Sequence, residues 1–209
     1  MLNKIKSYWY EIKTEYEKRY NKPFLKDFET SKEYLERMKS YLLKKQSEYP
    51  SNVDVICTLA SVCVELRDEK FDYIEFLQDF LDKFEKSLSD NDKARIYTNL
   101  AFWDDFSKDS LMCFNKAKDL NSPFVETYTG LGLYYFSEYE YSKDEKVLSI
   151  SHDYFKIARE MEESYVTSFN FAVSLFELKE YEKARLSVLP YLKDCTIIDA
   201  LSDYKFYEK

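Results

Sequence analysis

The sequence predicts an all-α protein built from long helices that are joined by short turns. Only two of its 209 residues are glycine and four are proline, whereas average composition would give a chain of this length roughly fifteen glycines. Hairpin turns and phosphate-binding loops both depend on glycine, so a β-sheet protein and a nucleotide-binding fold are disfavoured. Apolar residues instead recur every three or four positions, the spacing of one face of an α-helix.

Two helices are predicted at the start of the chain. Over residues 2–20 the large apolar side chains share one helical face, and Pro23 ends this helix because the residue before a proline avoids helical backbone. A second helix is expected over residues 30–49 and stops at Pro50.

Further helices follow, with polar turns between them, and no segment predicts a strand. Residues 53–66 are apolar almost all round, which is typical of a helix buried between others. Asp90 or Asn91 can cap a helix that runs through Phe102. The remaining predicted helices cover residues 71–88, 109–120, 124–140, 146–162, 165–178, 181–193 and a tail near 198–206.

Two short motifs recur along the chain and indicate a repeat. Helices approach closely only where a small side chain faces the neighbour, so a large apolar residue followed by a small one marks a crossing point. Such pairs fall in the first helix of four successive hairpins, and a Phe-x-x-Ala motif falls in the second helix of two. The pairs are Leu59-Ala60, Leu100-Ala101, Leu131-Gly132 and Phe171-Ala172, and the second motif is Phe114-x-x-Ala117 and Phe155-x-x-Ala158.

The repeated hairpins resemble the tetratricopeptide repeat family. The resemblance is best in residues 165–197, where Asn170-Phe171-Ala172, Leu175 and Glu180-Tyr181-x-x-Ala184 stand where the family has Asn-Leu-Gly, a Tyr and Asp-Tyr-x-x-Ala. The unit that ends at Asn121 and the unit over 124–163 match through the two recurring motifs. The latter unit carries an insertion around residues 138–146.

The resemblance implies a tetratricopeptide-like α-solenoid of about five helical hairpins plus a C-terminal helix. It implies a single domain over residues 1–209, with an N-terminal capping hairpin at 1–50, repeats at 51–197 and a tail helix at 198–209. Residues 51–89 match the family only at Leu59-Ala60. The alternative is an irregular helical bundle in which the motifs recur by chance.

The resemblance also implies a concave groove, lined by the first helix of each hairpin, in which family members hold peptides or protein segments. Asn99 and Asn170 stand where members place an amide against a bound backbone, but the Lys and Arg set that clamps a C-terminal carboxylate in chaperone-docking members is missing. The alternative is that the groove aromatics pack onto another element of the chain. The other expected groove residues are Arg95, Thr98, Phe102, Asp105, Phe106, Glu126, Thr129, Leu133, Phe136, Val166, Phe169, Val173, Phe176 and Glu177.

A second candidate surface is a row of carboxylates, Asp72, Glu75, Asp79 and Asp82, which we call the acidic ridge. Their spacing places them on one face of a helix, opposite the apolar face, where they could steer in a basic protein. The simpler interpretation is a solvated helix face. The run Trp103-Asp104-Asp105 is a further candidate, because an aromatic ring beside acids suits recognition of Lys or Arg.

No catalytic, cofactor-binding or metal site is predicted. His152 is the only histidine, so no histidine-bearing metal cluster can form, and the His152-Asp153 pair is expected to cap a helix or form a surface salt contact. No serine has the setting of a nucleophile. The four cysteines, Cys57, Cys63, Cys113 and Cys195, are expected to be buried free thiols in the cytoplasm.

Charge is distributed unevenly along the chain. The net charge is −8 and the pI is about 5.0, which disfavours nucleic acid as a partner. Residues 1–50 hold 12 basic and 8 acidic side chains, so the acidic character belongs to the rest of the chain. No apolar run is long enough for a signal peptide or a membrane span.

The sequence therefore predicts a non-enzymatic module that binds a basic protein or peptide, as a monomer or in a small complex with its partner. The narrower hypothesis is neutralisation of a basic toxin, as immunity proteins and antitoxins do. The alternatives are a peptide-sensing or adaptor protein and, from a different class, an enzyme on a helical scaffold.

Overall fold

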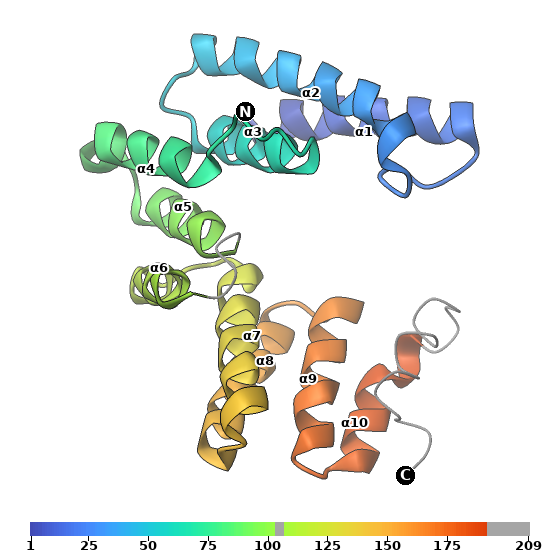
Figure 1. The fold of residues 1–209 in the computed structure, drawn as a ribbon, viewed down its shortest axis with the longest axis vertical. Helices are drawn as coiled ribbons and strands as arrows, with labels where there is room; N and C mark the ends of the chain where they lie inside the picture. Colours follow the sequence, from blue (N-terminus) through green and yellow to red (C-terminus); the bar gives the residue numbers. More distant parts are fainter. Residues whose placement is uncertain (103–106, 192–209) are drawn as a thin grey trace. The chain divides into compact units, whose positions relative to one another are not determined.

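The computed structural model describes residues 1–102 and 107–191, and all of their regular structure is helical (Figure 1). The expected tail helix at 198–209, Cys195 and the run from Trp103 to Phe106 lie outside the described residues. The chain divides into two compact units, residues 1–100 and 101–209. The expected division into a capping hairpin, repeats and a tail stays a prediction.

The helices begin and end close to the positions predicted from the sequence. Two predicted helices are shorter than expected: α4 gives way to a 3₁₀ turn, and α10 stops before Pro190, which has no N–H to continue the helical ladder. The helices are α1 (Leu2–Tyr20), α2 (Phe28–Glu48), α3 (Val53–Glu65), α4 (Tyr73–Phe84), α5 (Asp90–Phe102), α6 (Lys108–Asp119), α7 (Val125–Ser142), α8 (Glu145–Met161), α9 (Tyr165–Glu177) and α10 (Tyr181–Val188), with 3₁₀ turns at Glu85–Ser87 and Leu189–Tyr191.

Side-chain caps start most of these helices, and left-handed residues end several of them. Asn52 and Asp72, for example, each accept a hydrogen bond from the backbone N–H three residues ahead, which satisfies a donor that the first turn leaves free. Neither glycine occupies a left-handed position. Residues with side chains take that conformation just past the ends of α1, α3, α6, α7 and α9: Asn21, Arg67, Asn121, Lys143 and Lys179.

The insertion at 138–146 lengthens two helices and forms no loop of its own. Helix α7 continues to Ser142 and α8 begins at Glu145. Only Lys143 and Asp144 lie between them: Lys143 is left-handed, and the Asp144 side chain accepts a hydrogen bond from the Lys146 N–H. The inserted residues therefore extend the α7–α8 hairpin.

The core of the first unit is a cluster of buried side chains from α1, α2 and α3, in which α1 and α2 supply aromatic rings and α3 supplies aliphatic side chains. Tyr16 and Tyr34 are fully buried there, with ring centroids 5.4 Å apart in an edge-to-face arrangement. Each phenol oxygen has a partner, because that of Tyr16 lies 2.8 Å from Thr30 Oγ1 and that of Tyr34 accepts from Arg19. A buried tyrosine is stable only when its hydroxyl is satisfied in this way.

The second unit repeats one contact between a large ring and a small residue. Phe114 of α6 and Phe155 of α8 are buried, and a Cβ built onto Gly132 would lie 2.4 Å from Phe155 Cδ1. A Cβ on Gly130 would lie 2.1 Å from Phe114 Cζ. Both glycines therefore lie inside α7 because the rings occupy the space of their side chains.

Two buried serines accompany these rings and were not singled out from the sequence. Ser110 Oγ donates to the carbonyl of Ala101 at 3.1 Å, and Ser151 Oγ donates to the carbonyl of Gly132 at 2.8 Å. Each serine precedes its phenylalanine by four residues, and each bonds the small residue of the preceding helix. The same interhelical hydrogen bond thus joins α6 to α5 and α8 to α7.

Replacing Gly132 by alanine tests the ring contact. In an exposed helix interior, alanine is more stable than glycine by about 1 kcal/mol. At position 132, however, the new methyl group would overlap Cδ1 and Cε1 of the Phe155 ring. We expect Gly132→Ala to lower the free energy of unfolding by about 1–3 kcal/mol, measured by urea denaturation. The exposed Ser137→Ala change on the same helix is the control and should be neutral or slightly stabilising.

A double variant distinguishes this clash from a general effect on α7. Gly132→Ala combined with Phe155→Leu should be less unstable than the two single changes predict when added, because the smaller side chain leaves room for the methyl group. A Gly132→Ala chain as stable as the wild type would contradict the contact.

Candidate partner-binding site

A pocket of about 580 Å³ opens in the first unit between α1, α3 and the start of α5. The buried side chains of Ile5, Met38 and Val62 form its apolar floor. Trp9 is half-buried at its side, and its ring lies edge-on to Phe24 at 5.4 Å, which holds the indole in place. The remaining lining residues are Leu2, Lys6, Tyr10, Lys13, Leu25, Thr58, Ser61, Glu65 and Arg95.

The pocket coincides with the groove face that the repeat register implies. Thr58 and Ser61 lie two residues before and one residue after Ala60, the offsets that Asn99 and Phe102 have from Ala101. Sequence reasoning mapped no groove residues onto 51–89, because that repeat carries only Leu59-Ala60 of the motifs. Counting the same offsets from Ala60 would have found them.

An ion pair fixes the α5 side of the pocket. The Arg95 guanidinium binds the Asp54 carboxylate of α3, and both side chains are about three-quarters buried. Asp54 lies six residues before Ala60, as Arg95 lies six before Ala101. Equivalent groove positions of successive first helices therefore bind each other directly. Of the groove residues expected from the sequence, Arg95 lines the pocket.

The other expected groove residues of α5 differ in their exposure. Thr98 is buried, and its hydroxyl donates to the carbonyl of Ala94 at 2.8 Å. Asn99 is half-buried and donates to the carbonyl of Arg95 at 2.9 Å, so one of its amide hydrogens is already used within the helix. Phe102 is 37% exposed. Asp105 lies outside the described residues.

In the second unit the expected groove residues separate into core and surface. Phe136 is only 8% exposed and packs in the core with Phe155, at a centroid distance of 6.4 Å. We therefore remove Phe136, like Thr98, from the candidate surface. Phe169, Asn170 and Phe176 are half-buried on α9, and Glu126 is exposed at the start of α7.

The acidic ridge lies on the exposed face of α4. All four carboxylates are exposed, and none forms an ion pair within the part of the chain that the structure describes. Asp72 additionally caps the helix by accepting from the Glu75 N–H at 2.9 Å. Leu77, Phe80 and Leu81 form the opposite, buried face, so the ridge points away from the core of its unit.

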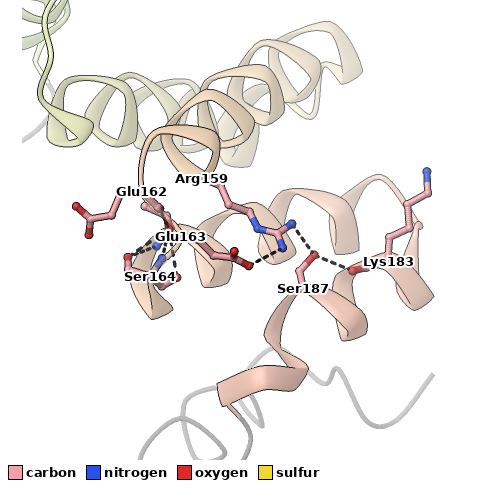
Figure 2. Close-up of polar contacts among 7 residues, drawn as sticks. Arg159, Glu162, Glu163, Ser164, Lys183 and Ser187 are labelled. Carbon is pink, nitrogen blue, oxygen red and sulfur yellow. Dashed lines mark hydrogen bonds and ion pairs between the residues drawn. The ribbon is translucent and has the colours of Figure 1, made fainter.

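Polar contacts between α8, α9 and α10 hold the end of the second unit together, as Figure 2 shows for the contacts of Arg159. Arg159 donates to Ser187 Oγ, pairs with Glu163, and lies 5.1 Å from the Phe171 ring centroid. Ser187 in turn donates to the carbonyl of Lys183 at 2.9 Å. These contacts are structural.

His152 lies in the middle of α8, so the expectation that it caps a helix or forms a surface salt contact is wrong. Helix α8 begins at Glu145, and this places His152 against α9. Its ring stacks on Phe171 at 4.9 Å, and Nδ1 lies 3.0 Å from Ser174 Oγ. Burial lowers the pKa of His152, the largest effect on that group.

The cysteines and acids of the described residues form no cluster that could hold a metal ion. Cys57 and Cys63 are buried free thiols, as expected, whereas Cys113 is half-buried and not fully buried as the sequence predicts. Burial raises the pKa of Cys57 to about 12. No group of His, Cys, Asp and Glu that could hold a metal ion occurs in residues 1–102 and 107–191, and no helix there could cross a membrane.

The lowered pKa of His152 predicts acid sensitivity of the second unit. The unfolded chain binds the proton more tightly than the folded chain, so the contribution of neutral His152 is complete above the unfolded pKa of about 6.5 and is lost as pH falls from there through the lower pKa of the folded chain. Urea denaturation should show that the wild type loses more stability than His152→Gln on acidification. An identical pH dependence of both chains would contradict the assignment.

Several solved structures are similar to this chain. A crystal structure of MamA matches with a TM-score of 0.53 and 18% identity over 78% of this chain and 94% of that one. A thermophilic TPR protein of Thermus thermophilus, TTC0263, matches with a TM-score of 0.53 and 13% identity over 84% of this chain and 89% of that one. No protein-family model and no curated protein matches the sequence. The chain therefore has the tetratricopeptide-like α-solenoid fold that its repeats predict.

Proposed function

We propose that this chain is a non-enzymatic binding module that holds a segment of a protein partner in the pocket between α1, α3 and α5. The observation that carries the proposal is an open, apolar-floored pocket at the positions where the repeat register places a groove. Tetratricopeptide-like proteins use that face to hold peptides, which supports a protein segment as the occupant.

The residue types around the pocket suit a protein interface. Trp, Tyr and Arg carry a disproportionate share of binding energy in interfaces, and Trp9, Tyr10 and Arg95 all line this pocket. Tyr10 is 70% exposed and therefore accessible to a partner. Thr58 and Ser61 add hydroxyl groups on the opposite wall. An apolar anchor with polar groups at its edge is the arrangement by which helical grooves hold an amphipathic segment.

The acidic ridge supports a second and narrower candidate, neutralisation of a basic toxin in the manner of immunity proteins and antitoxins. Four exposed carboxylates without ion pairs among the described residues form an uncompensated negative row on α4. Such a row raises the encounter rate with a basic protein. A peptide-sensing or adaptor role requires the pocket but not the acidic ridge. Variants of the ridge and variants of the pocket therefore distinguish this role from toxin neutralisation.

Filling the pocket tests the principal proposal. Ser61→Tyr places a ring in the pocket, whereas Ser47→Tyr places the same ring on the exposed face of α2. The two serines are matched, because each donates to the carbonyl four residues earlier in its own helix. Captured from a lysate of the source cells and quantified by mass spectrometry, the partner should bind the wild type and Ser47→Tyr and should be depleted at least tenfold on Ser61→Tyr.

Circular dichroism and the unfolding midpoint establish that both variants are folded. A partner that binds all three chains equally would show that the pocket is not its binding site.

Neutralising the ridge tests the second candidate. Replacing Asp72, Glu75, Asp79 and Asp82 together by serine retains a residue that can cap α4 at position 72. Association of the captured partner, followed by biolayer interferometry, should slow about tenfold at low salt and lose most of its dependence on ionic strength. The control replaces four exposed acids of the second unit by serine: Glu138, Glu140, Glu145 and Glu160.

If the ridge variant associates with the partner as fast as the wild type, the ridge is only a solvated helix face. The toxin-neutralising hypothesis would then lose its physical support, while the pocket would remain a candidate site.

A further inference from the structure

We infer that the pocket takes an acidic amphipathic segment, in which a large apolar side chain is flanked by Asp or Glu. The inference rests on the proposed function and names the chemistry of the occupant. An acidic occupant is the opposite of the basic partner that the sequence predicts from the net negative charge of the chain.

Two lysines flank the apolar anchor of the pocket. Lys6 and Lys13 lie three residues before and four residues after Trp9, so all three side chains share one face of α1. Both lysines are exposed and line the pocket. An apolar side chain resting beside Trp9 would therefore have an ammonium group on either side.

Neither lysine is committed to a strong partner within its unit. Lys6 makes no ion pair with any residue of the described ranges. Lys13 has one contact, with Glu17 at 3.8 Å, and both of those side chains are well exposed. An exposed pair of that kind contributes little to stability, so both ammonium groups can turn toward a ligand at little cost.

The opposite charges around the pocket do not cancel the lysines. Arg95 is already neutralised by Asp54 across α3 and α5. Glu65 is the one acidic residue among the described residues that line the pocket. The uncompensated charges therefore favour an anionic segment, even though the whole chain carries −8.

The acidic ridge does not contribute to the pocket. Leu77 and Leu81 form the buried face of α4, and the ridge occupies the opposite face. Thr58 and Ser61, by contrast, point into the pocket from α3. The ridge carboxylates and the pocket lysines thus lie on separate surfaces of the first unit, and none of the four ridge residues lines the pocket.

A peptide selection tests the chemistry of the occupant. The probe is a library of random dodecapeptides displayed on phage through their C-termini, so that no free C-terminal carboxylate is present. The library is selected on the full-length chain and counter-selected on Ser61→Tyr, with Ser47→Tyr as the matched control. We expect the surviving clones to be enriched in Asp and Glu next to Leu, Phe or Trp.

A charge reversal links that enrichment to the two lysines. Lys6→Glu combined with Lys13→Glu should lower the affinity for the selected peptides at least tenfold at low salt. Each exposed ion pair between a lysine and the peptide contributes about two- to fivefold to the affinity, and in the variant a repulsion between two carboxylates takes the place of each pair. Lys18→Glu combined with Lys44→Glu makes the same change in net charge on exposed lysines outside the pocket, and should leave affinity within about twofold of the wild type.

The outcomes separate the inference from the proposed function. Clones that depend on the pocket but are neutral or basic, or that ignore the lysine reversal, would overturn the acidic occupant and leave the pocket as a protein-binding site. A selection that yields no clone able to distinguish the wild type from Ser61→Tyr would overturn both.

Discussion

The second unit is held together by buried phenylalanine rings that pack against glycines of the neighbouring helix. A glycine inside a helix costs about 0.5–1 kcal/mol relative to alanine, yet α7 contains both glycines of the chain. Burying a phenylalanine side chain contributes about 1.5–3 kcal/mol, and Phe114 and Phe155 are buried in the space that these glycines leave. The contact also sets how closely successive helices approach, and the serine hydrogen bonds fix their rotation.

The same register determines which side chains remain available for a partner. When a small residue faces the neighbouring helix, the helical register places residues shortly before and after it in the sequence on the groove face. In α3 this places Thr58 and Ser61 at the pocket, and the ion pair between Asp54 and Arg95 joins equivalent positions of two first helices. The proposed binding surface is therefore a by-product of the packing that forms the repeat.

Helix positions could be predicted because their signals are local. Apolar spacing and stops such as Pro23 and Pro50 lie within a few residues of the boundaries that they determine. The large-small pairs also predicted the repeat fold. Groove exposure is not local, because the burial of Phe136 depends on α8 covering it, and periodicity along α7 does not show how far that cover extends.

The pocket was not predicted from the sequence, whereas the insertion was. The repeat over 51–89 lacks Phe-x-x-Ala, so no groove positions were counted from Ala60 although the offsets were already known from Ala101. The sequence predicts the insertion at 138–146 between helices that end at 140 and begin at 146, and Glu and Tyr are compatible with an exposed helix, so α7 extends into it. Only Lys143 and Asp144 leave helical geometry.

The left-handed residues at the helix ends have a consequence for the unfolded chain. Glycine would fit these positions with less steric cost, but each glycine enlarges the conformational entropy that the backbone loses on folding. With Arg67, Lys143 and Lys179 in place of glycine, the folded chain accepts local strain while its unfolded ensemble stays narrower. At these positions the steric cost outweighs the entropic gain, so the helix ends are where the folded chain carries strain.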